Sequence, residues 1–310
     1  MAKIGRLGIG LALVIGFVAA FWPVTPNMPH VLAQSAATGE WKASLNNENS
    51  KIQLNLERRT KRGGHNQMGQ TYDFSELQGL SREQALSGGP VRFSIVREAG
   101  RIDCEGTFQN GKGSGTFTFT PNAAFISAMK SRGFDFEADS KRRQTDNDGE
   151  NRLEERLFAA TTLNVTTALA DDLTSAFGKL DVEDLFKAAI FKIDSQFARE
   201  MKASGFENLG MEELVKARIF KIDAAFVRQV SDMGFQKEPF ESLVKMQIFK
   251  VTPEFIAEVR GEGLTNLQVE DIVKLRIFKI DGQFIRNAKA DGVPLEVERL
   301  VQRRIGVSRR

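Results

Sequence analysis

The segment IFKIDSQFAREMKASGFENLGMEELVKAR, residues 190–218, decides the fold, because similar copies begin at residues 219, 248 and 277. Three sets of residues keep a spacing of 29 along these copies. The sets are Phe197, Phe226, Phe255 and Phe284; Phe191, Phe220, Phe249 and Phe278; and Gly205, Gly234, Gly263 and Gly292. A fixed period of this length is typical of solenoids, in which each copy is one supersecondary unit.

Each copy predicts a pair of short helices. Asp194 suits the N-cap of the first helix, and Gly205 suits a left-handed residue just past its end. The second helix is expected to carry Leu214, Val215 and Ile219 on its apolar stripe. One such pair cannot bury its own apolar face, so neighbouring pairs are expected to stack into a continuous array.

The array is expected to cover residues 121–310. A degenerate copy has Leu169 where the clearest copy has Phe197, and an earlier copy begins at Phe125. Phe125 and Leu169 are 44 residues apart, which is one repeat and about half of another, and the polar stretch 137–151 is interpreted as the insertion. The last copy is shorter and ends in a basic, polar tail, as a capping repeat requires.

Residues 39–120 alternate apolar and polar side chains with period two, which is typical of strands with one buried face. The alternating sets are Trp41, Ala43 and Leu45; Ile52, Leu54 and Leu56; Val91, Phe93 and Ile95; Ile102, Cys104 and Phe108; and Phe117 with Phe119. Asn110-Gly111 is a hairpin signal, and Ser81 with Gln84 fits a capping box in a short helical stretch. We therefore expect an α+β chain: about five antiparallel strands in a small meander or open barrel, then an all-α helical-hairpin solenoid.

The N-terminus has the composition of a secretory signal peptide. Lys3 and Arg6 precede an uncharged, apolar run at 7–22, and Val-Leu-Ala at 31–33 fits a cleavage site. The expected organisation is a signal peptide at 1–33 and a linker at 34–38, and the protein is expected to be exported, periplasmic or secreted. The alternative is an uncleaved membrane anchor, although the apolar run is shorter than the roughly 20 residues that span a bilayer.

The charge of the chain does not favour nucleic-acid binding, since 43 basic residues stand against 40 acidic ones. Two series of lysines nevertheless repeat with the period of 29: Lys187, Lys216, Lys245 and Lys274; and Lys192, Lys221, Lys250 and Lys279. They could form a basic ridge that binds an anionic partner. We favour a structural role for both series. The first series is expected to pair with the glutamates four residues earlier. The second series is expected to lie at the C-terminal ends of the second helices, where a positive charge interacts favourably with the helix dipole.

Few residues are suited to catalysis or metal binding. The chain has two histidines, His30 and His65, and one cysteine, Cys104, which is expected to be a buried strand residue. His30 is expected to leave with the signal peptide, and no nucleophile motif accompanies His65. We therefore predict no catalytic residue, no metal site and no cofactor.

Two strings resemble ligand-binding motifs. GHNQMGQT at 64–71 is spaced like a phosphate-binding loop, but it has Gln70 where that motif needs lysine. Asp146, Asp148, Gly149 and Glu155 match part of a calcium loop, but its first position is Gln144 and basic residues precede it. We reject both as ligand sites, and we interpret the glycine-rich GKGSG at 111–115 as a hairpin tip.

The segment GPVRFSIVREAGRIDCEGTFQNGKGSGTFTFTPN, followed by repeats of the VTPEFIAEVRGEGL type, resembles a group of bacterial envelope proteins. Similar segments are attached to membrane metallopeptidases of the β-lactam-sensor class. The chain has no HExxH string, so the resemblance carries over no peptidase activity. It implies an extracytoplasmic binding or sensing module.

Three functions are compatible with these patterns. The first is a binding or scaffold protein that acts through the repeat array on an envelope protein, at the varied segments FENLGM, FQKEPF and LTNLQV. The second is a carboxylate-based enzyme acting on envelope material, and the third is a small-ligand carrier using the interior of the β domain. No small-molecule or nucleic-acid partner is identified, and a membrane partner is expected only if the signal segment stays uncleaved.

Overall fold

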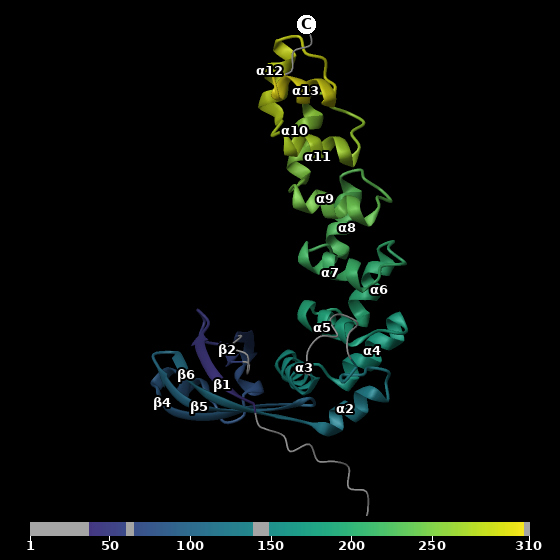
Figure 1. Ribbon diagram of the computed structural model, residues 1–310. Coiled ribbons are helices and arrows are strands. Elements are labelled where there is room, and N and C mark those ends of the chain that lie inside the picture. Colours follow the sequence, from purple (N-terminus) through teal and green to yellow (C-terminus); the bar gives the residue numbers. More distant parts are fainter. Residues whose placement is uncertain (1–36, 60–64, 139–148, 307–310) are drawn as a thin grey trace, which may run out of the picture. The chain divides into compact units, whose positions relative to one another are not determined.

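The computed structural model describes residues 37–59, 65–138 and 149–306 (Figure 1). From Ala36 onward the chain forms one compact unit. The expected signal peptide and most of the linker lie outside the described residues. Within them, an antiparallel sheet precedes a run of helices, as the α+β prediction required.

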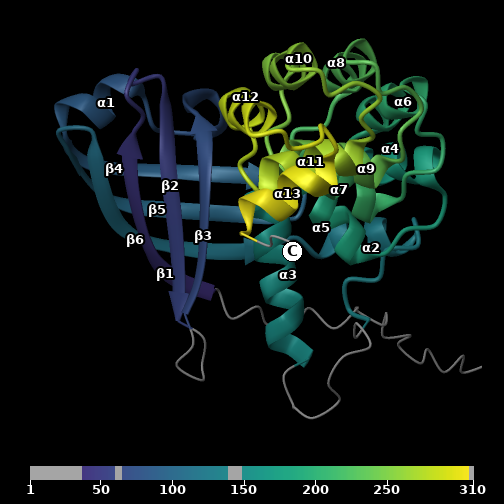
Figure 2. The same cartoon turned by 90° about the horizontal axis from the view of Figure 1, so that it is seen from above.

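The sheet has six strands in the order β3-β2-β1-β6-β5-β4 and curves into a half-barrel (Figure 2). The strands are β1 (Ala37–Leu45), β2 (Lys51–Arg59), β3 (His65–Asp73), β4 (Gly89–Arg97), β5 (Gly100–Gln109) and β6 (Lys112–Pro121). The prediction of about five strands missed β3, whose sequence HNQMGQTYD has only Met68 and Tyr72 as large apolar residues. As an edge strand, β3 pairs only with β2 and therefore needs fewer apolar contacts.

Trp41 of β1 lies at the centre of the sheet, where two three-stranded meanders meet through the β1–β6 pair. Its ring packs edge-on against Phe93 at 5.2 Å between centroids, and its indole N–H donates to the carbonyl of Glu105 at 3.1 Å. Gly106 and Gly115 face each other at this point. A Cβ at Gly106 would lie 2.6 Å from the indole, so these glycines make room for the ring.

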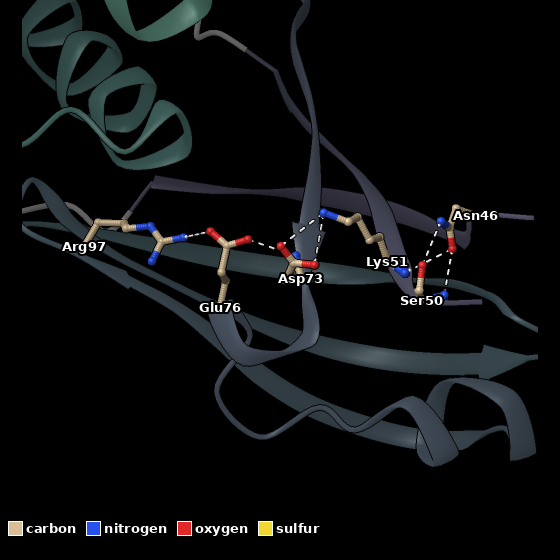
Figure 3. A network of polar contacts seen from close by, with 6 residues as sticks. All are labelled: Asn46, Ser50, Lys51, Asp73, Glu76 and Arg97. Atoms are coloured by element: carbon tan, nitrogen blue, oxygen red, sulfur yellow. Dashed lines mark hydrogen bonds and ion pairs between the residues drawn. The ribbon is translucent and has the colours of Figure 1, made fainter. Parts of the chain in front are cut away.

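The short helical stretch between β3 and β4 contains η1 (Phe74–Glu76) and α1 (Arg82–Ser87). Ser81 and Gln84 form the predicted capping box at the start of α1. Figure 3 shows how η1 is tied to the sheet: Arg97 Nη2 donates to Glu76 at 2.6 Å, and the Glu76 carboxylate accepts from the backbone N–H of Asp73. The carboxylate of Asp73 also pairs with Lys51. This network connects the two edge strands, β3 and β4, through η1.

The helices that follow alternate between two rows (Figure 2). The first row is α2 (Ala123–Lys130), α4 (Thr167–Phe177), α6 (Ser195–Ala203), α8 (Ala224–Asp232), α10 (Pro253–Gly261) and α12 (Gly282–Ala290). The second row is α3 (Gly149–Leu163), α5 (Val182–Phe191), α7 (Met211–Ile219), α9 (Phe240–Ile248), α11 (Val269–Ile277) and α13 (Val297–Arg304). The helical-hairpin array is thus present as expected.

The predicted ends of the first-row helices are confirmed. The Asp194 side chain accepts from the backbone N–H of Phe197, as an N-cap does. Gly205 has φ +101° just past the end of α6, where its N–H bonds to Lys202 and that of Phe206 bonds to Met201. This is a Schellman motif, which requires a left-handed residue at the glycine position.

Helix α3 belongs to both parts of the fold. It occupies the second-row position of the first repeat, and its Phe158 stacks on Phe117 at 5.5 Å and meets Phe119 edge-on. Arg58 of β2, only 8% exposed, pairs with Glu154 of α3. The stretch 137–151 is therefore not wholly an insertion: residues 149–151 form the first turn of α3, and 139–148 lie outside the described residues.

The predicted apolar stripe is wrong at one residue, Ile219. Leu214 and Val215 of α7 are buried, but Ile219 is 53% exposed. Ile219 follows the buried Val215 by about one turn, but it is the last residue of α7, where the neighbouring repeats no longer cover the side chain. The isoleucine that opens each IFK string is therefore a surface residue.

Candidate functional site

The residues singled out for chemistry do not come together. Cys104 of β5 is buried, as expected, and burial raises the pKa of its thiol. From His65 onward, the string that resembles a phosphate-binding loop forms part of strand β3. Asn110-Gly111 forms the predicted hairpin tip. His30 and residues 144–148 of the calcium-loop-like string lie outside the described residues. Within the described part, no cluster of three or more potential metal ligands occurs.

A surface hollow of about 510 Å³ lies on the outer side of the sheet. Its lining includes Glu40 of β1 and Glu57 of β2, which are directly paired across the two strands, with Thr116 and Thr118 of β6 beside them. Directly opposed residues on neighbouring strands have Cβ atoms about 5 Å apart. The hollow thus contains two carboxylates on directly opposed residues, the kind of pair that a carboxylate enzyme uses.

The first lysine series connects neighbouring repeats. Lys216 Nζ lies 2.7 Å from Glu241, and Lys245 Nζ lies 3.0 Å from Glu270, in each case one repeat further along. Lys187 pairs with Glu212 and Lys274 with Glu298 in the same way. The structural role was predicted, but the partners were wrong, because each lysine side chain extends across to the next second-row helix.

Arginines make a second set of contacts between repeats. The guanidinium of Arg218 lies 3.7 Å from the centroid of Phe197, and its Nη2 donates to the carbonyl of Lys192 at 2.7 Å. Arg276 and Arg304 lie over Phe255 and Phe284 in the same arrangement. Each arginine therefore caps the end of the preceding second-row helix and covers a core ring.

Two grooves of about 370 and 480 Å³ separate successive first-row helices. In the first, the carboxylate of Asp172 accepts from the hydroxyl of Ser195 at 2.5 Å and from its N–H at 2.8 Å. These bonds lower the pKa of Asp172. At the equivalent place Glu258 accepts from the N–H of Gly282, which has no hydroxyl, so the carboxylate's shared role is to cap a helix.

The varied segments, of which FENLGM and FQKEPF line these grooves, are only partly surface. Glu207 and Lys237 are exposed, as expected of residues free of packing constraints. Phe235, Leu264 and Leu267 are buried, so the expectation that these segments are free surface is wrong for them. Their apolar residues follow the Schellman glycine, where a contact back onto the helix is usual.

The most regular surface feature is a row of exposed isoleucines. Five large apolar residues at the ends of second-row helices are 48–54% exposed: Ile190, Ile219, Ile248, Ile277 and Ile305. Single exposed apolar residues are ordinary on protein surfaces. The five isoleucines recur at the ends of α5, α7, α9, α11 and α13, so the row is a continuous feature of this part of the array.

Comparisons with protein-family models, with curated proteins and with solved structures found no match to this chain. Among the described residues, no helix combines the length and apolar character needed to cross a membrane.

Proposed function

We propose that this chain is an extracytoplasmic binding or scaffold protein that contacts an envelope protein through its helical array and performs no catalysis. The exposed isoleucine row supports this best, because packing within the array does not account for it. A solenoid offers a long surface on which one feature repeats at regular intervals. The resemblance to bacterial envelope proteins supports the same class of function.

The experiment is affinity capture from envelope extract with residues 36–310 as bait. Fragments divided at residue 120 are unsuitable, because Phe158 of α3 packs on Phe117 and Phe119 of the sheet. Surface variants of the whole unit serve better: Glu105→Lys changes the exposed face of the sheet, and Ile219→Ser changes the array. Loss of capture with the array variant alone supports the proposal, whereas loss with the sheet variant alone contradicts it.

The paired glutamates support a second candidate, an enzyme that acts on envelope material through Glu40 and Glu57. Two carboxylates on neighbouring strands can divide the roles of general acid and base. Glu40→Gln is expected to abolish hydrolysis of peptidoglycan or polysaccharide by the purified protein if this candidate holds. Equal activity of both forms, or none in the wild type, removes it.

The carrier function receives no support from the concave face of the sheet. Phe158 of α3 packs on Phe117 and Phe119 at that face, so a ligand there would have to displace a helix that also belongs to the array.

Export is part of the proposal and rests on the N-terminal residues alone. Mass spectrometry of the exported protein is expected to show a start near Gln34. An intact Met1 in the membrane fraction would instead indicate the uncleaved anchor.

A further inference from the structure

The surface that carries the isoleucine row also carries lysines in a costly backbone conformation. Lys192, Lys221, Lys250 and Lys279 each follow two residues after an exposed isoleucine, and their φ angles are +56°, +56°, +52° and +51°. The left-handed conformation is strained for a residue with a Cβ and unstrained for glycine. These positions therefore favour glycine on conformational grounds.

The chain uses glycine wherever the same turn occurs in the first row. At the end of α7, Lys221 N–H bonds to Arg218 and Ile222 N–H bonds to Ala217, which is the Schellman pattern. At the end of α6 the same pattern has Gly205 at the left-handed position. The last second-row helix, α13, also ends with a glycine, Gly306 at φ +76°. Lysine in the internal second-row turns is thus not a requirement of the turn.

The side chains of these four lysines are free to contact a partner. Each is exposed, and none takes part in an ion pair found among the described residues. The other lysine series is fully occupied by glutamates of the next repeat. We call the four lysines and the five exposed isoleucines together the isoleucine–lysine ridge.

The isoleucines of this ridge are expected to have a regular spacing. The isoleucine row follows α5, α7, α9, α11 and α13, which succeed one another along the array (Figure 1). Packed helices lie about 8–10 Å apart. An extended polyproline-type segment rises about 3.1 Å per residue with three residues per turn, so every third side chain returns to one face after about 9 Å.

We propose that the isoleucine–lysine ridge binds an extended, acidic segment of a partner protein that carries an apolar side chain at about every third residue. The apolar side chains would lie on the isoleucines, and carboxylates between them would pair with the free lysines. This inference rests on the proposed function, since it names the surface and the chemistry of the partner.

The charge pattern favours this occupant over two others. Two copies of the chain facing each other through this surface would bring lysine toward lysine. An anionic membrane would also meet the row of exposed glutamates, including Glu212 and Glu241, on the same helices. A single acidic segment can follow the lysines without contacting that row.

The test measures binding of a synthetic peptide with leucine at every third position and aspartate or glutamate between, using residues 36–310. A matched peptide has asparagine and glutamine in place of the acids. We expect the acidic peptide to bind, the amide peptide not to bind, and the affinity to fall as salt is added. No binding of the acidic peptide overturns the proposal.

Variants then locate the site. Ile219→Ser with Ile248→Ser, and separately Lys221→Gly with Lys250→Gly, are each expected to weaken binding about tenfold or more. The glycine variants keep the turn, so their melting temperature should stay the same or rise. Lys237→Gly is the matched control, because Lys237 also has a left-handed φ of +58° but lies in the loop between α8 and α9, at the groove between first-row helices. Binding unaffected by the ridge variants, or weakened equally by the control, overturns the proposal.

Two further measurements separate the alternatives. Binding of the protein to phosphatidylglycerol vesicles in preference to the peptide would assign the ridge to a membrane. Self-association that Ile219→Ser with Ile248→Ser abolishes would assign it to a second copy. If that double variant loses the envelope partner although the wild-type protein does not bind the acidic peptide, the ridge inference fails while the proposed function stands.

Discussion

The ammonium group of Lys216 lies 2.7 Å from the carboxylate of Glu241, which belongs to the following repeat. Glu212, four residues before Lys216 on the same helix, pairs instead with Lys187 of the preceding repeat. The ion pairs therefore run along the array and join each second-row helix to the next. Since these side chains are exposed, the pairs contribute little individually and act mainly on the alignment of neighbouring repeats.

The direction of this pairing can be measured with double-mutant cycles. Lys216→Gln and Glu241→Gln are expected to be less than additive in the free energy of unfolding, whereas Lys216→Gln and Glu212→Gln should be additive. The coupling should disappear at about 1 M salt, where screening acts over about 3 Å. Coupling to Glu212 but not to Glu241 would show that the pairs are within helices.

The same ion pairs predict a range of pH over which their contribution to the stability of the protein stays constant. Hydrogen bonding to Lys245 lowers the pKa of Glu270, so its contribution is present above the usual glutamate pKa of about 4.3 and is lost as the pH falls further. Hydrogen bonding to Glu241 raises the pKa of Lys216, so its contribution is lost only as the pH rises above about 10.4. Melting temperatures across this range should be flat for these pairs, and a dependence near pH 7 would contradict the assignment.

Phe255 tests the core of the array. Its side chain is 7% exposed, and the guanidinium of Arg276 lies 4.8 Å from its centroid. Phe255→Ala is expected to destabilise the protein by about 3–5 kcal/mol in chemical denaturation. The equivalent Phe284 is only partly buried, in the repeat before the C-terminal helix, so Phe284→Ala should have a smaller effect. Equal effects would show that burial does not determine the loss.

The contact between arginine and phenylalanine can be tested by removing it in one repeat and introducing it in another, because one repeat has glutamine at the arginine position. Arg218 covers Phe197, whereas the equivalent Gln247 only donates to the carbonyl of Lys221. Arg218→Gln should destabilise the protein by about 0.5–1 kcal/mol, and Gln247→Arg should stabilise it by a similar amount. A stabilising Arg218→Gln substitution, measured by urea unfolding, would contradict this role of the ring contact.

Cys104 should be inert while the sheet is folded. Its side chain is 1% exposed, and burial raises the pKa of the thiol, so very little reactive thiolate is present at neutral pH. A thiol reagent is expected to label it only in denaturant. Rapid labelling of the native protein, with melting unchanged, would indicate that β5 opens locally.

Several features of the fold could be predicted from local sequence. The spacing of Phe197, Gly205 and their equivalents indicated paired helices, since N-caps and left-handed glycines act within a few residues. Alternation around Trp41 and Phe93 indicated strands. Strand β3 was not predicted, because it has few apolar residues. It needs few because it lies at the edge of the sheet, a position that local sequence does not specify.

The sequence by itself determined the repeat, its helix boundaries and the alternating strands, because these depend on residues close together in the chain. Only the tertiary structure decided which residues meet across repeats. It placed Glu241 rather than Glu212 beside Lys216, Phe158 against Phe117, and Ile219 on the surface rather than in the core. These outcomes depend on how the helices stack, and a helical periodicity alone does not show which part of its apolar stripe the neighbours will cover.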